Sequence, residues 1–177
     1  AERESAAGFL IRHSLVIRIW SFVILPMLHI VLYQPEIPHN TGAVGRLCLA
    51  AGARLHLIKP LGFRIDDRQL KRAGLDYWQD VDVHVWDSLE DLRREADADV
   101  PWFLLTTKAS QTYWDATFTR ECYLVFGPET RGLPESLLQE PGVSCLRIPM
   151  QGTRSLNLAT AVGIVLYEAL RQTHGTG

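Results

Sequence analysis

Short, continuously apolar runs alternate along most of this chain with segments of helical composition. Runs that are apolar at every position are typical of β-strands covered on both faces. Six mostly apolar runs predict strands, at residues 28–33, 54–58, 81–85, 102–106, 123–126 and 145–148. The intervening segments predict helices at residues 43–51, 67–73, 88–98, 135–139 and 155–172. This alternation predicts an α/β domain with a mostly parallel sheet flanked by helices on both faces.

Local signals mark some of the helix ends. Asn40 or Thr41 is predicted to cap the helix at 43–51, and Gly52 to end it. The string at 88–91, Ser-Leu-Glu-Asp, resembles a capping box and predicts the start of the acidic helix. The final helix carries a long apolar stripe on one face.

Two of the predicted strands stop abruptly at proline, at Gly127-Pro128 and at Ile148-Pro149. Proline lacks an N–H group and disfavours a helical residue before it, so the chain must leave the strand there. Ligand sites of parallel sheets lie at the carboxyl ends of strands. The corresponding loops here are 34–41, 107–112, 127–133 and 150–154. Two proline-ended loops side by side, rich in backbone donors and acceptors, predict a small-molecule site.

The length of 177 residues suits one domain, which we assign to residues 27–174. Residues 1–26 are interpreted as an N-terminal extension of unknown role, with Met27 as a natural start. Within it, residues 9–25 are strongly apolar but are interrupted by Arg12, His13 and Arg18. A signal or anchor, or an extra strand or interface segment, are the alternatives.

Composition and charge are those of an ordinary soluble protein, at 47% hydrophobic and 21% charged residues with a net charge of -2. The net charge gives no global reason to expect nucleic acid, but the basic residues between Arg64 and Arg72 predict either a local basic face or a solvated helix. The three cysteines have no C-x-x-C spacing, which favours buried thiols in a reducing cytoplasm. The histidines are scattered, so no metal site is expected. The apolar stretch at 9–25 is short for a membrane span, so no membrane association is expected.

Several common enzyme motifs are missing from the chain. It has no G-x-G-x-x-G loop, no P-loop and no G-x-S-x-G elbow. What remains is a set of polar residues near the predicted strand ends: Asn40, Arg46, Glu129, Arg131, Arg154, Ser155 and Asn157. Arginines suit phosphate recognition. Alternatively, Arg46 and Arg154 pair with Glu36 or Glu129, and the two asparagines are only helix caps.

Four strings, in this order, resemble the three motifs of the SPOUT-class RNA 2′-O-methyltransferases, and most closely the short TrmL type that acts on the wobble nucleotide of tRNA. They are Asn40-Thr41-Gly42-x-x-x-Arg46, the run from Phe126 to Pro134 (FGPETRGLP), Ile148-Pro149-Met150, and Arg154-Ser155-Leu156-Asn157-Leu158. The resemblance extends from Met27 to about Gln172 and includes Leu32-Tyr33-x-Pro35-Glu36-Ile37-Pro38 and Arg72-Ala73-Gly74-Leu75-Asp76-Tyr77.

The resemblance implies a fold, a cofactor and partners. The sheet would contain a deep C-terminal trefoil knot, which general topology rules make very rare. S-adenosylmethionine would bind in the knot crevice, through the residues Leu105, Gly127, Ile148 and Ser155, with Met150 and Leu156 nearby. The substrate would be the anticodon loop of tRNA. The family works as homodimers, which makes Leu158, Val162, Val165 and Tyr167 candidate interface residues unless they are intramolecular core.

The resemblance also implies residue roles. Arg46, Asn40 and Asn157 would be catalytic, with the two asparagines orienting Arg46 and the ribose, and Arg154 and Arg131 would bind RNA. Arg46 is an unsuitable base, because a guanidinium has a pKa above about 12 and deprotonating it at neutral pH would cost about 7 kcal/mol. We therefore favour a role in holding the adjacent phosphate and polarising the 2′-hydroxyl. The alternatives are another tRNA or rRNA position, a non-catalytic RNA-binding protein on this fold, or a small-molecule α/β enzyme.

Overall fold

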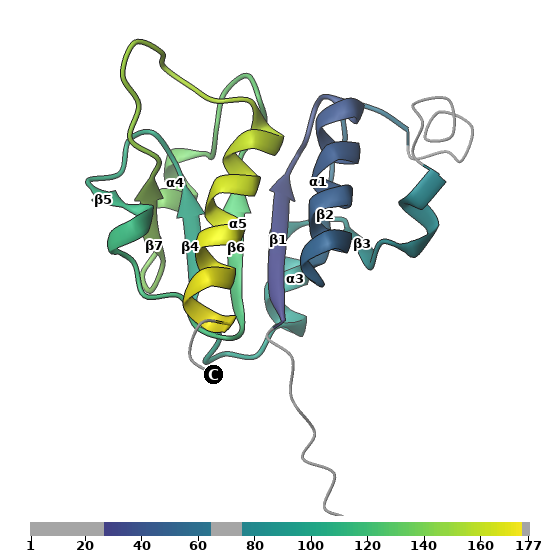
Figure 1. Ribbon diagram of the computed structural model, residues 1–177, viewed down its shortest axis with the longest axis horizontal. Coiled ribbons are helices and arrows are strands. Elements are labelled where there is room, and N and C mark those ends of the chain that lie inside the picture. Colours follow the sequence, from purple (N-terminus) through teal and green to yellow (C-terminus); the bar gives the residue numbers. More distant parts are fainter. Residues whose placement is uncertain (1–26, 65–75, 175–177) are drawn as a thin grey trace, which may run out of the picture.

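A parallel β-sheet forms the centre of the chain (Figure 1). The computed structural model describes residues 27–64 and 76–174. Its strands are β1 (Leu28–Tyr33), β2 (Arg54–Ile58), β3 (Val83–Trp86), β4 (Trp102–Leu105), β5 (Gln111–Thr112), β6 (Cys122–Phe126) and β7 (Ser144–Arg147). They lie in the order β3-β2-β1-β6-β4-β7-β5, and every described pair is parallel.

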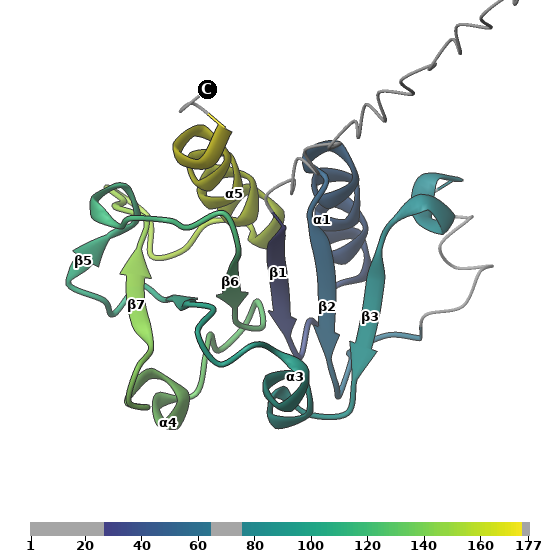
Figure 2. The same ribbon diagram turned by 90° about the horizontal axis from the view of Figure 1, so that it is seen from below.

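Helices cover both faces of this sheet, which confirms the predicted α/β class. The α-helices are α1 (Pro38–Ala51), α3 (Leu89–Glu95), α4 (Glu135–Leu138) and α5 (Leu158–His174), and two short 3-10 helices are η1 (Asp76–Asp80) and η2 (Tyr113–Asp115). Figure 2 shows α1 and α5 on one face and α3 and α4 on the other. The expected trefoil knot stays a prediction.

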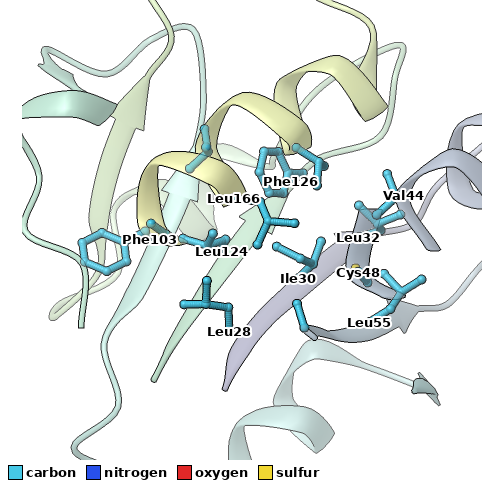
Figure 3. Packing of buried hydrophobic residues seen from close by; sticks show 14 of the residues in the cluster. Leu28, Ile30, Leu32, Val44, Cys48, Leu55, Phe103, Leu124, Phe126 and Leu166 are labelled. Carbon is cyan, nitrogen blue, oxygen red and sulfur yellow. The ribbon is translucent and has the colours of Figure 1, made fainter. Parts of the chain in front are cut away.

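The core lies in two layers because side chains alternate across each strand. On β1, Leu28, Ile30 and Leu32 are buried on the side of α1 and α5, whereas Val31 belongs to the layer beneath α3 and α4. Figure 3 shows the first layer, where Leu166 of α5 and Val44 and Cys48 of α1 pack on the strands.

The burial of the apolar residues of α5 shows which of them belong to the core of the single chain. Leu158, Val162 and Val165 are buried within this single chain, so their prediction as interface residues is wrong and the intramolecular alternative holds for them. They pack on the sheet because α5 returns over β1 and β6. Tyr167, 51% exposed, remains a candidate for a subunit interface. Leu49 of α1, which was not predicted, is also an exposed apolar side chain, at 41%.

The helix boundaries differ from the predicted ones in instructive ways. Helix α1 begins at Pro38, so Asn40 lies inside its first turn and does not cap it. Proline is favoured at this position because its φ is already helical and its missing N–H is not needed. Gly52 ends the helix in the left-handed conformation, as predicted. Ser88 caps α3, also as predicted, by accepting a hydrogen bond from the Asp91 amide. Helix α5 begins at Leu158 and not at Ser155.

A row of polar side chains, of which the two histidines are buried, crosses the sheet from β3 to β1 on the face of α3. The Trp86 indole Nε1–H donates to Nδ1 of His56 over 3.0 Å, and Nε2 of His56 lies 2.9 Å from Nδ1 of His29. The Nε2 of His29 lies 3.3 Å from a carboxylate oxygen of Glu121. Because the indole can only donate and the carboxylate only accepts, both imidazoles must be neutral, each with its proton on Nε2. We call these four residues the histidine relay.

Some predictions fall outside the described residues: the extension at 1–26, the basic helix at 67–73, and most of the basic cluster near it. The short strand β5 and the helices η1 and η2 were not predicted. Within the described ranges, no helix is long and apolar enough to cross a membrane.

Candidate active site

A cavity of about 690 Å³ opens at the carboxyl edge of the sheet, where β4, β6 and β7 end. In Figure 1 this edge is at the top, and the loop from β7 to α5 rises above it. The parallel ladders end at Phe126 and Arg147, so Gly127 and Ile148 are the first residues beyond the sheet. The cavity is lined by Leu105–Lys108, Phe126–Leu133, Ile148, Met150, Arg154–Leu156, Leu158 and Ala161.

All six residues predicted to hold the cofactor lie on this cavity: Leu105, Gly127, Ile148, Met150, Ser155 and Leu156. The two arginines predicted to contact RNA, Arg131 and Arg154, line it as well. The loops after β6 and β7 are not direct neighbours, because β4 lies between their strands. The end of β4 therefore forms the middle of the floor. Sequence reasoning assigned no role to Phe126, Leu133 or Lys108, which also line the cavity.

The loop at 127–133 folds back tightly on itself at Gly127. A Cβ atom added to Gly127 would lie 2.4 Å from the carbonyl carbon of Gly132 and from the amide nitrogen of Leu133. The loop is closed by the Gly132 amide, which donates to the Pro128 carbonyl over 3.0 Å. Gly132 has φ +70°, a conformation that suits glycine. Gly127 is therefore required by the backbone that forms the cavity wall.

Two glutamates join this loop to the chain entering α1. Glu129 accepts hydrogen bonds from the backbone amides of Glu36, at 2.9 Å, and Ile37, at 3.3 Å. In return, the Glu36 carboxylate accepts from the amide of Thr130, at 3.1 Å, and from its hydroxyl, at 2.9 Å. We call this reciprocal pairing the glutamate lock. Because both carboxylates bind backbone donors in the opposite loop, the alternative in which they pair with Arg46 or Arg154 is wrong.

Gln34 extends the same junction to Arg131. Its side-chain oxygen accepts from the Arg131 guanidinium over 2.7 Å, and its backbone amide donates to the Ile58 carbonyl over 3.0 Å. Gln34 has φ +51°, which is unusual for a residue other than glycine. The chain therefore keeps a left-handed residue at the end of β1, where its side chain holds an arginine on the cavity rim.

A directed chain of amides connects the lock to the start of α5. The Asn40 Nδ2 group donates to Glu129 over 2.9 Å, and its Oδ1 accepts from Asn157 Nδ2 over 2.9 Å. The Asn157 Oδ1 accepts from the Thr160 amide over 3.2 Å, which caps α5. Since a carboxylate only accepts, the orientation of both amides is determined. Asn157 is thus a cap and a partner of Asn40 at the same time.

Arg46 lies apart from this network. It is exposed on α1, and its guanidinium carbon sits 4.4 Å from the centre of the Tyr77 ring. It is not among the residues that line the cavity. Within the single chain, Asn40 and Asn157 bind each other and Glu129, so their predicted role in orienting Arg46 stays a prediction. The sequence could not show that Arg46 lies apart, since this depends on how α1 is rotated on the sheet.

The cysteines are poorly suited to nucleophilic chemistry. Burial raises the pKa of Cys48 and of Cys122 to about 12. The half-buried Cys145 thiol also has a raised pKa, chiefly because of burial. Among the residues that the structure describes, no group of three or more His, Cys, Asp or Glu side chains is arranged to hold a metal ion.

Residues of three of the four motif strings line a cavity at the carboxyl edge of an open α/β sheet, and comparison with known proteins identifies the class. Residues 27–167 match the model of the SpoU rRNA Methylase family, and the chain belongs to this family. This confirms the resemblance and shows that the chain is of an enzyme family.

Two of the similar proteins are named or described for a reaction on tRNA. A protein of Escherichia coli (strain K12) named tRNA (cytidine(34)-2′-O)-methyltransferase is 49% identical over 150 residues, which cover 82% of this chain and 94% of that protein. A solved structure described as "Structural insights into the 2-OH methylation of C/U34 on tRNA" has a TM-score of 0.79 at 49% identity, covering 84% of this chain and 97% of the other. The structure of the SpoU methyltransferase AviRb of Streptomyces viridochromogenes in complex with AdoMet has a TM-score of 0.73 at 26% identity. The match covers 88% of this chain and 60% of AviRb.

Proposed function

We propose that this protein transfers a methyl group from S-adenosylmethionine to the ribose 2′-hydroxyl of the wobble nucleotide, cytidine or a modified uridine, in tRNA. The observation that carries the proposal is the convergence of all six expected cofactor residues on one cavity. The relatives named for this reaction match almost their whole length, which supports the substrate. A tRNA substrate agrees with the cytoplasmic location expected from the cysteines.

The cavity suits the cofactor in size and in lining. Its volume of about 690 Å³ lies within the range usual for small-molecule sites. Leu105, Phe126, Ile148 and Leu156 provide apolar walls, and the chain leaves the sheet at Gly127 and Ile148, where backbone groups can bind a ligand. S-adenosylmethionine supplies an electrophilic methyl group when bound. The protein must therefore place the hydroxyl in line with that group and assist the loss of its proton.

The chain's own residues divide this work. Arg154 and Arg131, on the cavity rim, bind phosphate of the RNA, and Gln34 keeps Arg131 in place. Asn40 and Asn157, with orientations set by Glu129 and by the α5 cap, position the ribose. Arg46 holds the neighbouring phosphate and polarises the 2′-hydroxyl, whose proton passes to phosphate or water.

A homodimer is part of the proposal, because Arg46 lies outside the cavity of its own chain. Helices α1 and α5 pack side by side on one face of the sheet, and each exposes an apolar side chain, Leu49 and Tyr167. We assign the subunit contact to this face, so that each subunit brings its Arg46 to a site shared with the other.

Methyl transfer to total tRNA is the direct test. Purified protein is incubated with labelled S-adenosylmethionine and tRNA from a strain that lacks the wobble 2′-O-methyl group, and the product is digested to nucleosides and mapped. The proposal expects label in 2′-O-methylcytidine or a 2′-O-methyluridine derivative at position 34. Label at another tRNA position or in rRNA would support the alternative substrate. The absence of both methyl transfer and S-adenosylmethionine binding would support a non-catalytic RNA-binding protein.

A further inference from the structure

The short helix η1 is attached to α1 by two consecutive aromatic residues. The Tyr77 hydroxyl donates a hydrogen bond to the Gly42 carbonyl over 3.0 Å. The Trp78 ring packs directly on the backbone at Gly45, where an added Cβ atom would lie 2.6 Å from the ring. Gly45 thus makes room for Trp78 on the surface of α1, and the Gly42 carbonyl binds Tyr77. Any larger residue at Gly45 would push η1 away from the helix.

Arg46 lies one turn after Gly42 on the same side of α1, since residues four apart share a helix face. The Tyr77 ring spans this turn: its hydroxyl is bound to Gly42, and the Arg46 guanidinium lies over its face, with 4.4 Å between the guanidinium carbon and the ring centre. A cation at this distance is attracted by the ring electrons. Ring and guanidinium are therefore fixed to the same helix.

An aromatic ring and a carboxylate, as partners of the Arg46 guanidinium, leave it with different capacities to bind a ligand. A carboxylate would occupy two N–H groups of the guanidinium and cancel its charge. The face of a ring stabilises the cation through its π electrons and leaves the N–H donors at the edge of the guanidinium plane available. Within the described residues, no ion pair involves Arg46. Such an arrangement suits an arginine that must bind phosphate and ribose oxygens.

We propose that Tyr77 is a positioning residue for the methyl transfer, which holds Arg46 in its working rotamer through its ring and holds its own ring in place through the Gly42 carbonyl. This inference rests on the proposed function, since it assumes that Arg46 acts on the RNA. It assigns a role to the Asp76-Tyr77-Trp78 segment, which is far from the cavity-lining loops in sequence.

Three variants test the role of Tyr77. The substitution Tyr77→Leu removes the ring, and kcat should fall about 10-fold, because misplacing a reacting group by about 1 Å can cost on the order of 10²-fold. Tyr77→Phe keeps the ring, and kcat should stay within about 3-fold of wild type. The affinity for S-adenosylmethionine should change less than about 2-fold in both, because Tyr77 does not line the cavity. As a control, Trp102→Leu removes the ring beneath Arg93, a second cation–π pair with 5.3 Å spacing, and should leave kcat unchanged.

An Arg46→Lys background separates positioning from general loss of structure. If Tyr77 acts through Arg46, adding Tyr77→Leu to Arg46→Lys should lower kcat by less than about 2-fold. The side-chain NMR signals of Arg46 should be shifted upfield by the ring in wild type and in Tyr77→Phe, but not in Tyr77→Leu. Unchanged kcat in Tyr77→Leu, with active wild type, would overturn the inference alone. An inactive wild type would overturn the proposed function, and unshifted Arg46 signals would still refute the pairing with Tyr77.

Discussion

At the scale of single residues, the structure changes the roles of the carboxylates more than those of the cavity residues. Strand ends and proline steps were enough to place Gly127 and Ile148 at one cavity, because parallel strands end at one edge of a sheet. Sequence could not show that Glu36 and Glu129 exchange hydrogen bonds with each other's loops, since the pairing joins residues 93 and 94 positions apart. A glutamate between two prolines, as at Pro35-Glu36-Ile37-Pro38, carries no periodic signal.

The substitution Gly127→Ala should abolish the cavity's affinity for S-adenosylmethionine, with a loss of at least about 10-fold. Its Cβ atom would lie 2.4 Å from backbone atoms of Gly132 and Leu133, and backbone cannot move aside as a flexible side chain can. Gly163→Ala in α5 is the matched control, because its Cβ would meet Leu47 at an ordinary 3.5 Å and alanine favours a helix. Calorimetric titration measures both affinities. Wild-type affinity in Gly127→Ala would contradict the proposed cavity wall.

Arg154→Ala should weaken tRNA binding uniformly across isoacceptors. Removal of one phosphate contact should reduce the slope of log K against log salt concentration by about 0.7 to 0.9. Arg94→Ala is the control, because Arg94 is an exposed arginine paired with Asp91 on α3, on the other face of the sheet. The affinity for tRNA is measured at several salt concentrations for Arg154→Ala, for Arg94→Ala and for wild type. An equal slope for Arg154→Ala and wild type would remove Arg154 from the RNA-binding surface.

At the scale of elements, the six predicted strands agree with the structure within two residues, because most of their positions are apolar and the central strands are buried on both faces. The start of α1 was placed too late, because Pro-His-Asn looks like a loop when read locally, although proline is favourable in the first helical turn. The strand β5 has two residues and no pattern of its own, so only its pairing with β7 defines it. Helix η1 is likewise defined by its packing on α1 and not by composition.

The histidine relay should make the protein less stable as the pH falls. Burial, with the neighbouring His29 and His84, lowers the pKa of His56 from 6.5 to about 3, and burial also lowers the pKa of His29. Between pH 6.5 and about 3, the unfolded chain binds a proton at His56 that the folded chain does not. The contribution of His56 to the free energy of unfolding therefore rises with pH in this window and is constant above it. The contribution of His56 is at most about 1.4 kcal/mol per pH unit.

Urea unfolding at several pH values between 7.5 and 5 measures this dependence. In His56→Phe the slope of unfolding free energy against pH should be smaller, even though the variant is less stable overall, since Trp86 and His29 lose a partner. His39→Gln, at an exposed position of α1, should keep the wild-type slope. An unchanged slope in His56→Phe would show that the relay tolerates a proton.

At the scale of the whole molecule, the candidate site is divided between two surfaces. The cavity lies at the carboxyl edge of β4, β6 and β7, whereas Arg46 is on the exposed side of α1. The family resemblance placed these residues in one site, but the chain folds them onto different parts of its surface. This division is the physical argument for the proposed dimer. The dimer can be tested by combining two variants in one assembly, which measurements on single variants cannot do.

Two inactive variants should restore activity to each other when they form a mixed dimer. A chain with Arg46→Ala keeps an intact cavity, and a chain with Gly127→Ala keeps Arg46. In a mixed dimer, one site would combine the intact cavity with the arginine of the other subunit. Co-expression with two affinity tags, purification of the mixed species and a methylation assay provide the measurement. If both groups had to come from one chain, the mixed dimer would be as inactive as its parents.

The glutamate lock has a thermodynamic consequence, because it couples the binding of the methyl donor to the binding of nucleic acid. It joins the cavity wall at 129–130 to the segment that enters α1, and α1 is the helix that carries Arg46. A ligand that steadies either end therefore lowers the entropic cost of ordering the other. Such coupling is reciprocal by necessity: whatever factor the methyl donor adds to the affinity for nucleic acid, the nucleic acid must add to the affinity for the donor.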